Sequence, residues 1–310
     1  MRKFIGYETL INNFKDRCMN NALSHAHLIA GEAGIGKSKL ANILAKLILN
    51  GEFDREYVDI INYSTSKASF GVDDVRNIIE EVSKKPFEGD KKVIIIHEGN
   101  KLTIQAQNAL LKTIEEPPMG VHIIILCESL ELILDTIKSR CEIYKLTPLT
   151  KDELYEYIRI KKFNFNENEI KSAIAFSEGI PGRVDRYFND NNLKELRSKT
   201  LELLRDLNKN NVEIILQHEE NFIGLKDNKE EVLNILGGFI RDILIHKEVE
   251  NKNFIINGDK IDDINELTKE MSFRKLNNMI MTIEEARRNI KSNVSWAMTL
   301  RVMLMGFMEG

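Results

Sequence analysis

Gly31-Glu32-Ala33-Gly34-Ile35-Gly36-Lys37-Ser38 is the stretch that decides the fold. It matches the phosphate-binding pattern G-x-x-x-x-G-K-[ST] at every fixed position. Apolar residues 27–30 precede it and predict a strand, and residues 39–49 follow with apolar side chains at helical spacing. A turn that opens a helix attracts anions, because its free amides and the helix dipole favour negative charge. The stretch therefore predicts a nucleotide site in an α/β domain.

Each fixed residue of this loop has a physical role. Gly31, Gly34 and Gly36 let the backbone curl so that successive amides point at phosphates. Lys37 adds a charge near the terminal phosphates, and the Ser38 hydroxyl is a ligand for Mg2+. We therefore expect ATP or ADP with Mg2+ here. The alternative, a glycine-rich turn with a solvated lysine, is disfavoured by the strand and helix on either side.

Composition limits the class of protein. The chain has 310 residues, of which 43% are hydrophobic, enough for two or three domains. Its 48 acidic and 44 basic residues give a net charge of -4, so no global basic field indicates a stand-alone nucleic-acid binder. Any contact with DNA is expected to be local or shared with partners.

Cysteine usage and hydropathy predict the compartment. Cys18, Cys127 and Cys141 are far apart and form no C-x-x-C pair, which argues against a disulfide scaffold and against a zinc site. The first residues contain no apolar signal core, and no apolar run reaches 18 residues. A reducing, cytoplasmic location without membrane insertion is expected.

The order of apolar segments predicts the domain organisation. Up to residue 147, short apolar runs alternate with helical stretches, as in a parallel α/β sheet. Strands are expected at residues 27–30, 58–63, 92–96, 122–126 and 142–146, with a sheet-packing helix at 72–84. After Pro148 the pattern is amphipathic and helical, at residues 151–159, 166–176, 193–207, 230–245, 264–271, 274–289 and 293–308. Polar residues 189–192 indicate a further boundary, which gives domains 1–147, 148–190 and 191–310.

A second motif of P-loop enzymes is altered in this chain. An apolar strand usually ends in Asp-Glu, where Asp supports Mg2+ and Glu polarises the attacking water. Here residues 93–96 are followed by His97 and Glu98. Glu98 fits the pattern, but an imidazole is a poor replacement for a hard oxygen ligand of Mg2+. His97 is either a general base or, as we favour, a strand-end residue left after selection for hydrolysis relaxed.

Three further motifs carry a resemblance to a known family. They are Ser24-His25-Ala26-His27-Leu28, the run from Gln107 to Pro118 that reads QNALLKTIEEPP, and Thr136-Ile137-Lys138-Ser139-Arg140-Cys141. Together they resemble bacterial clamp-loader subunits of the AAA+ class, with fainter similarity at residues 289–294. Within that family the resemblance is closest to the delta-prime type of DNA polymerase III subunit. It covers nearly the whole chain.

The resemblance implies a role for each domain and for several residues. It implies an AAA+ P-loop nucleotide-binding domain at 1–147, a helical lid at 148–190 and an all-α collar for oligomerisation at 191–310. Arg140 matches the arginine finger that acts in trans on a neighbour's ATP, the alternative being an ion pair within its own domain. Arg183 matches the second sensor of the lid, or else is a solvated residue at a helix start. Cys127 and Glu128 occupy a sensor position for which a thiol is a weak donor. Residues 47–66 contain no cysteine, so the family's four-cysteine zinc module is not expected.

The function implied is that of a stator in a heteropentamer. Such a subunit binds ATP or ADP with weak or no ATPase of its own and supplies Arg140 to a neighbouring subunit of the DNA polymerase III holoenzyme. Its implied partners are the gamma/tau and delta subunits and, indirectly, the sliding clamp and primer-template DNA. The alternative is an independently active motor ATPase of the gamma/tau type, which Glu98 favours and His97 opposes. A small-molecule kinase would leave the motif around Arg140 unexplained.

Overall fold

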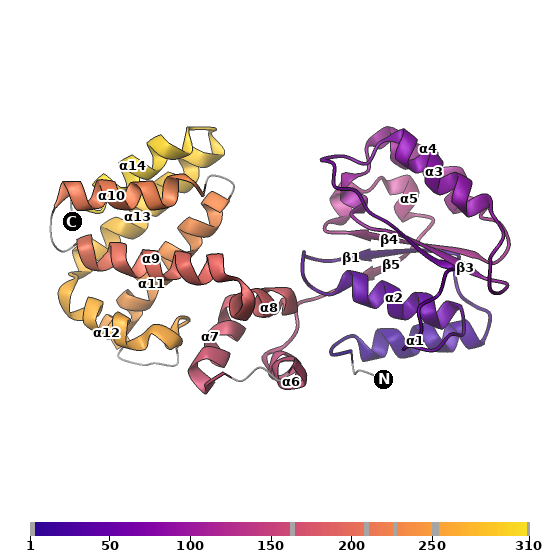
Figure 1. Ribbon diagram of the computed structural model, residues 1–310, viewed down its shortest axis with the longest axis horizontal. Helices are drawn as coiled ribbons and strands as arrows, with labels where there is room; N and C mark the ends of the chain where they lie inside the picture. The colour runs from indigo at the N-terminus through magenta and orange to yellow at the C-terminus, as the bar shows by residue number, and fades with distance from the viewer. Residues whose placement is uncertain (1–3, 162–164, 208–210, 226–227, 250–253, 309–310) are drawn as a thin grey trace. The chain divides into compact units, whose positions relative to one another are not determined.

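A computed structural model describes residues 4–161, 165–207, 211–225, 228–249 and 254–308. The chain forms two compact units (Figure 1). The first comprises Met1–Lys161 with Gly179–Gly182, and the second comprises Lys162–Glu178 with Arg183–Gly310. The first unit is α/β and the second is helical in all its described elements. The expected fold class, a parallel-sheet domain followed by helices, is confirmed.

The first unit is built on a parallel sheet. Its strands are ordered β2-β3-β4-β1-β5, with bounds β1 Ala26–Ala30, β2 Ile60–Tyr63, β3 Lys92–Ile96, β4 Val121–Cys127 and β5 Glu142–Lys145. His27 on β1 stands level with Ile124 on β4 and with Glu142 on β5. Because every pairing is parallel, all carboxyl ends of the strands meet at one edge of the sheet and all amino ends at the other.

Helices cover both faces of this sheet (Figure 1). α1 (Glu8–Met19) and α2 (Lys37–Ile48) lie on one face, and α3 (Val72–Ser83), α4 (Ile104–Glu115) and α5 (Asp135–Lys138) lie on the other. Successive strand residues point to opposite faces, so Leu28 joins the core beneath α3 and α4 while Ile29 joins the core beneath α2. Burial on both faces explains why the three central strands, β1, β3 and β4, consist mostly of apolar residues.

The five predicted strands are confirmed, with small shifts at their ends. The largest shift is at β2, which begins at Ile60 and leaves Val58 61% exposed. The buried Asp59 carboxylate accepts hydrogen bonds from the backbone amides of Phe87 and Glu88, each at 2.7 Å. This side chain fixes the loop before β3, which explains the polar residue at the entry to β2. The unit also contains α6 (Lys151–Lys161).

The second unit consists of helices around one apolar core in its described residues. They are α7 (Glu167–Ser177), α8 (Pro181–Asn189, whose first two residues belong to the first unit), α9 (Asn191–Asp206), α10 (Val212–Ile223), α11 (Lys229–Val249), α12 (Ile261–Glu270), α13 (Phe273–Lys291) and α14 (Trp296–Gly306). The seven helical segments predicted after Pro148 are confirmed, the first of them as α6 of the first unit, whereas α8 and α10 were not predicted. Two polar residues of α10, His218 and Glu219, interrupt its apolar pattern and are buried against Asp206 and Arg301.

The boundary expected at residues 189–192 is a junction between two helices. α8 ends at Asn189, and the Asp190 carboxylate caps α9 by accepting from the backbone amides of Asn192 and Leu193 at 2.9 and 3.3 Å. Short polar residues favour such caps. The division into domains 148–190 and 191–310 stays a prediction.

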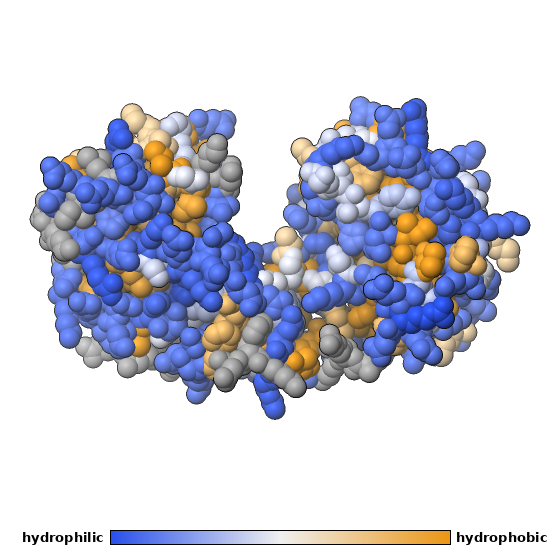
Figure 2. Space-filling model, viewed as in Figure 1, coloured by the Kyte–Doolittle hydropathy of each residue, from blue (hydrophilic) through white to orange (hydrophobic). Residues whose placement is uncertain are grey.

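Most of the protein surface in view is polar. The face shown in Figure 2 is largely hydrophilic, with apolar side chains in separate patches. An exposed apolar row lies on α14, where Met298, Val302 and Met305 are 60%, 48% and 40% exposed at the spacing of one helix face. Among the described helices, none is both long and apolar enough to cross a membrane.

Candidate nucleotide site and arginine site

The glycine-rich loop lies at the carboxyl edge of the sheet, between the end of β1 at Ala30 and the start of α2 at Lys37. Gly34 and Gly36 have φ angles of 83° and 112°, a region that strains residues with a side chain. The two glycines therefore allow the curl that turns the loop amides inward. The predicted strand, loop and helix occur in that order.

The segment before Arg183 braces this loop. The Gly182 amide donates to the Gly34 carbonyl at 3.0 Å, and a Cβ at Gly182 would lie 2.8 Å from the Gly34 Cα. Ile180 contacts the loop as well, because a Cβ at Gly34 would lie 3.2 Å from its Cγ2. From the sequence, only Arg183 of this segment was predicted to act at the nucleotide. Its two glycines, Gly179 and Gly182, were the available signal for a close approach of backbone to backbone.

The Lys37 side chain folds back onto the glycine-rich loop. Its ammonium group donates to the carbonyls of Gly31 and Glu32 at 2.6 and 2.9 Å. Burial lowers the pKa of Lys37, and the nearby Glu128 opposes that shift. The cation therefore already lies within the loop, where a bound phosphate would compete for it with neutral carbonyl groups.

Ser38 faces His97 across the carboxyl edge. The Ser38 hydroxyl lies 3.3 Å from Nδ1 of His97, whose Nε2 lies 2.9 Å from the Oδ1 of Asn62 at the end of β2. The amide oxygen of Asn62 only accepts, so Nε2 carries the proton and Nδ1 accepts from Ser38. Burial lowers the pKa of His97, which keeps the imidazole neutral, while Glu98 opposes the shift. Asn62 was not singled out from the sequence.

Glu98 is engaged elsewhere. It adopts a left-handed backbone conformation with φ of 55°, and its carboxylate accepts from Lys101 at 2.9 Å. That hydrogen bond lowers the pKa of Glu98. The side chains bonded to one another beside the loop are thus a hydroxyl, an imidazole and an amide. The imidazole nitrogen of this set is not one of the hard oxygen ligands that Mg2+ prefers.

Arg140 lies at the opposite edge of the sheet, two residues before β5. Its Nε donates to the carboxylate of Glu115, the last residue of α4. Its Nη1 donates to the carbonyl of Thr136 at 2.8 Å and to the hydroxyl of Ser139 at 3.3 Å. The ion pair within the domain, which the sequence left as the alternative role, is therefore present. Nη2 makes no hydrogen bond to any residue that the structure describes, and the side chain is 38% exposed.

A histidine fixes the turn that carries Glu115. Nε2 of His25 lies 2.7 Å from the carbonyl of Ile114 near the end of α4. The residue four positions after Ile114 is Pro118, which has no amide to donate to that carbonyl. The His25 ring bonds to that carbonyl in place of the missing backbone amide. From its spacing, this histidine was expected only to pack or to lie at the surface.

The two sites do not converge within the chain. The loop follows the carboxyl end of β1, whereas Arg140 and Glu115 lie near the amino ends of β5 and β4. β1 has five residues, so its ends are roughly 13 Å apart at about 3.3 Å a residue. The sheet therefore separates Arg140 from the phosphate loop of its own chain.

Two further residues, Cys127 and Arg183, lie at positions where the resemblance implies a sensor of bound phosphate. Cys127 ends β4 fully buried, and burial raises the pKa of its thiol to about 11, so it is a neutral, weak donor. Arg183 belongs to the second unit, where it pairs with Glu178. Its role at a bound phosphate stays a prediction.

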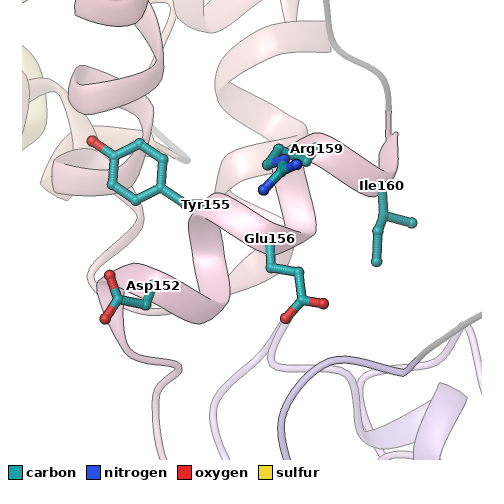
Figure 3. A pocket seen from close by; sticks show the side chains of 5 residues that line it. All are labelled: Asp152, Tyr155, Glu156, Arg159 and Ile160. Carbon is teal, nitrogen blue, oxygen red and sulfur yellow. The ribbon is translucent and has the colours of Figure 1, made fainter.

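A hollow beside α6 is not part of either site. It is lined by residues of that one helix, namely Asp152, Tyr155, Glu156, Arg159 and Ile160 (Figure 3). None of them belongs to the phosphate loop or to the arginine site. Within the described part of the chain, no group of three or more His, Cys, Asp and Glu side chains is placed to hold a metal ion.

Comparison with known proteins assigns the chain to a family. Residues 6–150 match the family described as DNA polymerase III, delta subunit, and residues 191–307 match its C-terminal family. The delta' subunit of DNA polymerase III from Bacillus subtilis is 25% identical over 306 residues, which cover 93% of this chain and 92% of that protein. The chain belongs to the delta-prime family of DNA polymerase III subunits. The resemblance seen in the sequence is confirmed.

Other relatives of this delta-prime family member match about half of the chain. The Haemophilus influenzae delta' subunit is 31% identical over 173 residues, covering 51% of this chain and 53% of that protein. The replication factor C small subunit of Haloarcula marismortui is 31% identical over 156 residues, covering 50% and 46%. The chain thus spans about half the length of several curated relatives. A gamma subunit-related protein from Thermotoga maritima shares the fold, with a TM-score of 0.56, 17% identity and coverage of 96% and 98%. The AAA+ assignment of the fold is confirmed.

Proposed function

We propose that this delta-prime family member is a clamp-loader subunit that binds ATP or ADP with little hydrolysis of its own. Its Arg140 contacts the nucleotide bound by a neighbouring gamma/tau-type subunit and promotes hydrolysis there. The complex uses that hydrolysis to load the sliding clamp on primed DNA. The observation that carries the proposal is the position of Arg140 at the amino edge of the sheet, opposite its own phosphate loop.

The geometry of Arg140 suits an arginine finger. A guanidinium stabilises the charge that develops on a transferred phosphoryl group and binds oxygens through several donors at once. Glu115, Thr136 and Ser139 engage Nε and Nη1 from within the chain. Nη2 has no hydrogen-bond partner among the residues that the structure describes. The side chain is thus held in place while one of its donor groups can bind a phosphate of the neighbouring subunit.

The nucleotide site supports binding more than turnover. The loop has the glycine conformations and the lysine that phosphate binding requires. Hydrolysis needs an oriented water and charge neutralisation at the phosphate. Here Glu98 is paired with Lys101, and His97 stands where the carboxylate usually lies. The alternative of an independent motor ATPase has less support for these two reasons.

The helical unit supports a role in assembly. The row Met298, Val302 and Met305 on α14 is exposed, whereas Leu300, Met303 and Leu304 on the same helix are buried. An apolar row of this kind is suited to packing against a helix of another subunit. The proposed partners are the gamma/tau and delta subunits, with the sliding clamp and primer-template DNA reached through the assembled complex.

The test is Arg140→Ala in a complex reconstituted with gamma/tau and delta subunits. We expect the clamp- and DNA-stimulated ATPase of the complex to fall by at least about 100-fold, because arginine fingers contribute roughly 1,000-fold or more in related systems. ADP affinity of the isolated chain should not change. Arg76→Ala is the matched control, since Arg76 is exposed and pairs only with Asp73 on its own helix. Equal ATPase rates for the Arg140→Ala and wild-type complexes would exclude the role in trans.

A further inference from the structure

The carboxyl edge of the sheet presents two metal-ligating atoms side by side. Ser38 Oγ and His97 Nδ1 lie 3.3 Å apart. Two adjacent ligands of an octahedral ion, each about 2.1 Å from the metal, are about 3 Å apart. The pair is thus already spaced to bind one cation between them.

The imidazole is held in the form that ligates metals. Asn62 at the end of β2 accepts from Nε2 of His97 at 2.9 Å, which leaves the Nδ1 lone pair directed at Ser38. A hydrogen bond from the second ring nitrogen to an oxygen acceptor is the usual partner of a metal-bound histidine. Here it fixes both the tautomer and the ring orientation before any metal arrives.

The choice of ion follows from these donor atoms. Mg2+ demands oxygen ligands and exchanges its waters reluctantly for nitrogen. Divalent ions of the first transition row accept imidazole, with affinities that rise from Mn2+ towards Cu2+. Mn2+ also keeps the preference for phosphate oxygen that a nucleotide site requires. An imidazole in place of a carboxylate therefore changes which ion the site favours.

We propose that Ser38 Oγ and His97 Nδ1 together bind a divalent first-row transition ion that arrives on the nucleotide, in preference to Mg2+. This inference rests on the proposed nucleotide binding. Two protein donors are too few to hold the ion alone, the adjacent Glu98 carboxylate is bonded to Lys101, and the described residues contain no group of three or more His, Cys, Asp and Glu placed to hold a metal ion. Phosphate oxygens and water complete the coordination, so the ion binds only together with nucleotide.

The first experiment is calorimetry of ADP binding to the full chain in EDTA, in Mg2+ and in Mn2+. We expect ADP to bind about tenfold more tightly with Mn2+ than with Mg2+, a difference well within calorimetric resolution. His97→Gln should remove this difference, and His97→Asp should reverse it by restoring an oxygen ligand. His122→Gln is the control, because this histidine lies near the amino end of β4, at the opposite edge of the sheet. It should behave as wild type.

The second experiment is pulsed electron paramagnetic resonance of Mn2+ with ADP and the protein. Direct ligation by His97 gives electron spin echo modulation from the imidazole nitrogen, which 15N labelling of the histidines distinguishes from modulation by adenine nitrogen. The modulation should disappear in His97→Gln and persist in His122→Gln. ADP binding that is equal in Mg2+ and Mn2+, or a spectrum without imidazole nitrogen modulation, overturns the metal inference and leaves nucleotide binding standing. Absence of ADP binding in all three buffers overturns the proposed nucleotide site and this inference with it.

Discussion

The two edges of the sheet present different side chains. At the carboxyl edge, the phosphate loop is complete, but the carboxylate that usually accompanies it is replaced by His97, bonded to Ser38 and Asn62. At the amino edge, Arg140 is held by the Glu115 carboxylate and by two oxygens of its own turn. In the proposed function, the carboxyl edge binds a nucleotide and the amino edge presents the Arg140 guanidinium to a neighbouring subunit. A histidine in place of the metal-binding carboxylate at the carboxyl edge is therefore compatible with an arginine held in place at the amino edge.

The edges also differ in how they treat charge. The ammonium of Lys37 at the carboxyl edge remains partly accessible and faces carbonyl groups. At the amino edge, His27 is fully buried between Phe14, His122 and Tyr144, and burial lowers its pKa to about 3. The ammonium of Lys37 is therefore partly open to solvent, whereas the imidazole of His27 is buried and uncharged near neutral pH.

The largest expected effect is that of Lys37→Ala on the carboxyl edge. Removing the ammonium from the loop should weaken ADP binding by at least about 100-fold, roughly 2.7 kcal/mol. Lys39→Ala is the matched control on the same helix, since Lys39 is exposed and one residue beyond the loop. Calorimetry on both variants decides the matter. An ADP affinity for Lys37→Ala within threefold of wild type would remove the loop from the proposed nucleotide site.

The second prediction concerns pH and the amino edge. Above about pH 6.5 His27 is neutral in both the folded and the unfolded chain. Below that value the unfolded chain binds a proton that the folded chain resists, because the folded pKa is about 3. Stability is thus lost as pH falls, by roughly 2 kcal/mol between pH 7.5 and pH 5.

Urea unfolding of wild type and His27→Gln at these two pH values measures this effect. The variant should lose less stability on acidification than wild type. The lowered pKa of His122 acts in the same direction and remains in both proteins, so it cancels in the comparison. The groups nearest His27, namely Tyr144, Glu142 and Arg17, are also unchanged. Equal pH dependence in the two proteins would show that His27 accepts a proton in the folded state.

The third prediction tests the brace on the phosphate loop. Gly182→Ala places a Cβ 2.8 Å from the Gly34 Cα and 2.9 Å from its carbonyl oxygen, so the loop must shift. We expect ADP affinity to fall about tenfold and the free energy of unfolding to fall by about 1–3 kcal/mol, as for other overpacked sites. Gly237→Ala is the control, because a Cβ there meets nothing within 4 Å and α11 favours alanine. If both variants bind ADP as wild type does, Gly182 does not set the loop geometry.

The smallest expected effect is that of Glu115→Gln on the arginine. The substitution keeps the shape of the side chain and removes its charge, and exposed ion pairs contribute up to about 1 kcal/mol. Clamp-stimulated ATPase of the reconstituted complex should fall up to about fivefold, and hydrogen exchange at the Arg140 Nε should accelerate in the isolated chain. Glu116→Gln, the same change one residue along, should alter neither quantity. Faster exchange without a change in ATPase would separate the ion pair from the proposed function.

Much of the fold could be predicted because its signals are local. The central strands β1, β3 and β4 are short apolar runs that are almost entirely buried, whereas β2 and β5 at the two margins of the sheet are partly exposed. Most helices have apolar residues at helical spacing; in the second unit, α8 and α10, the latter with its buried polar groups, were not predicted. The loop was predicted from its glycine pattern. That pattern is informative because Gly34 and Gly36 adopt conformations that other residues avoid. The histidine in place of the usual aspartate was also recognisable from the sequence, because His97 directly follows the apolar residues of β3.

The sequence by itself determined the parallel α/β unit, the phosphate loop, the altered strand end and the family, because each is written in neighbouring residues. Only the tertiary structure decided which of these groups meet. Strand order places Asn62 beside His97, and packing brings Gly182 onto Gly34. Glu115 pairs with Arg140 across 25 residues of chain, at the edge away from the loop. Such contacts depend on long-range packing of strands and helices, for which no local period in the sequence provides a signal.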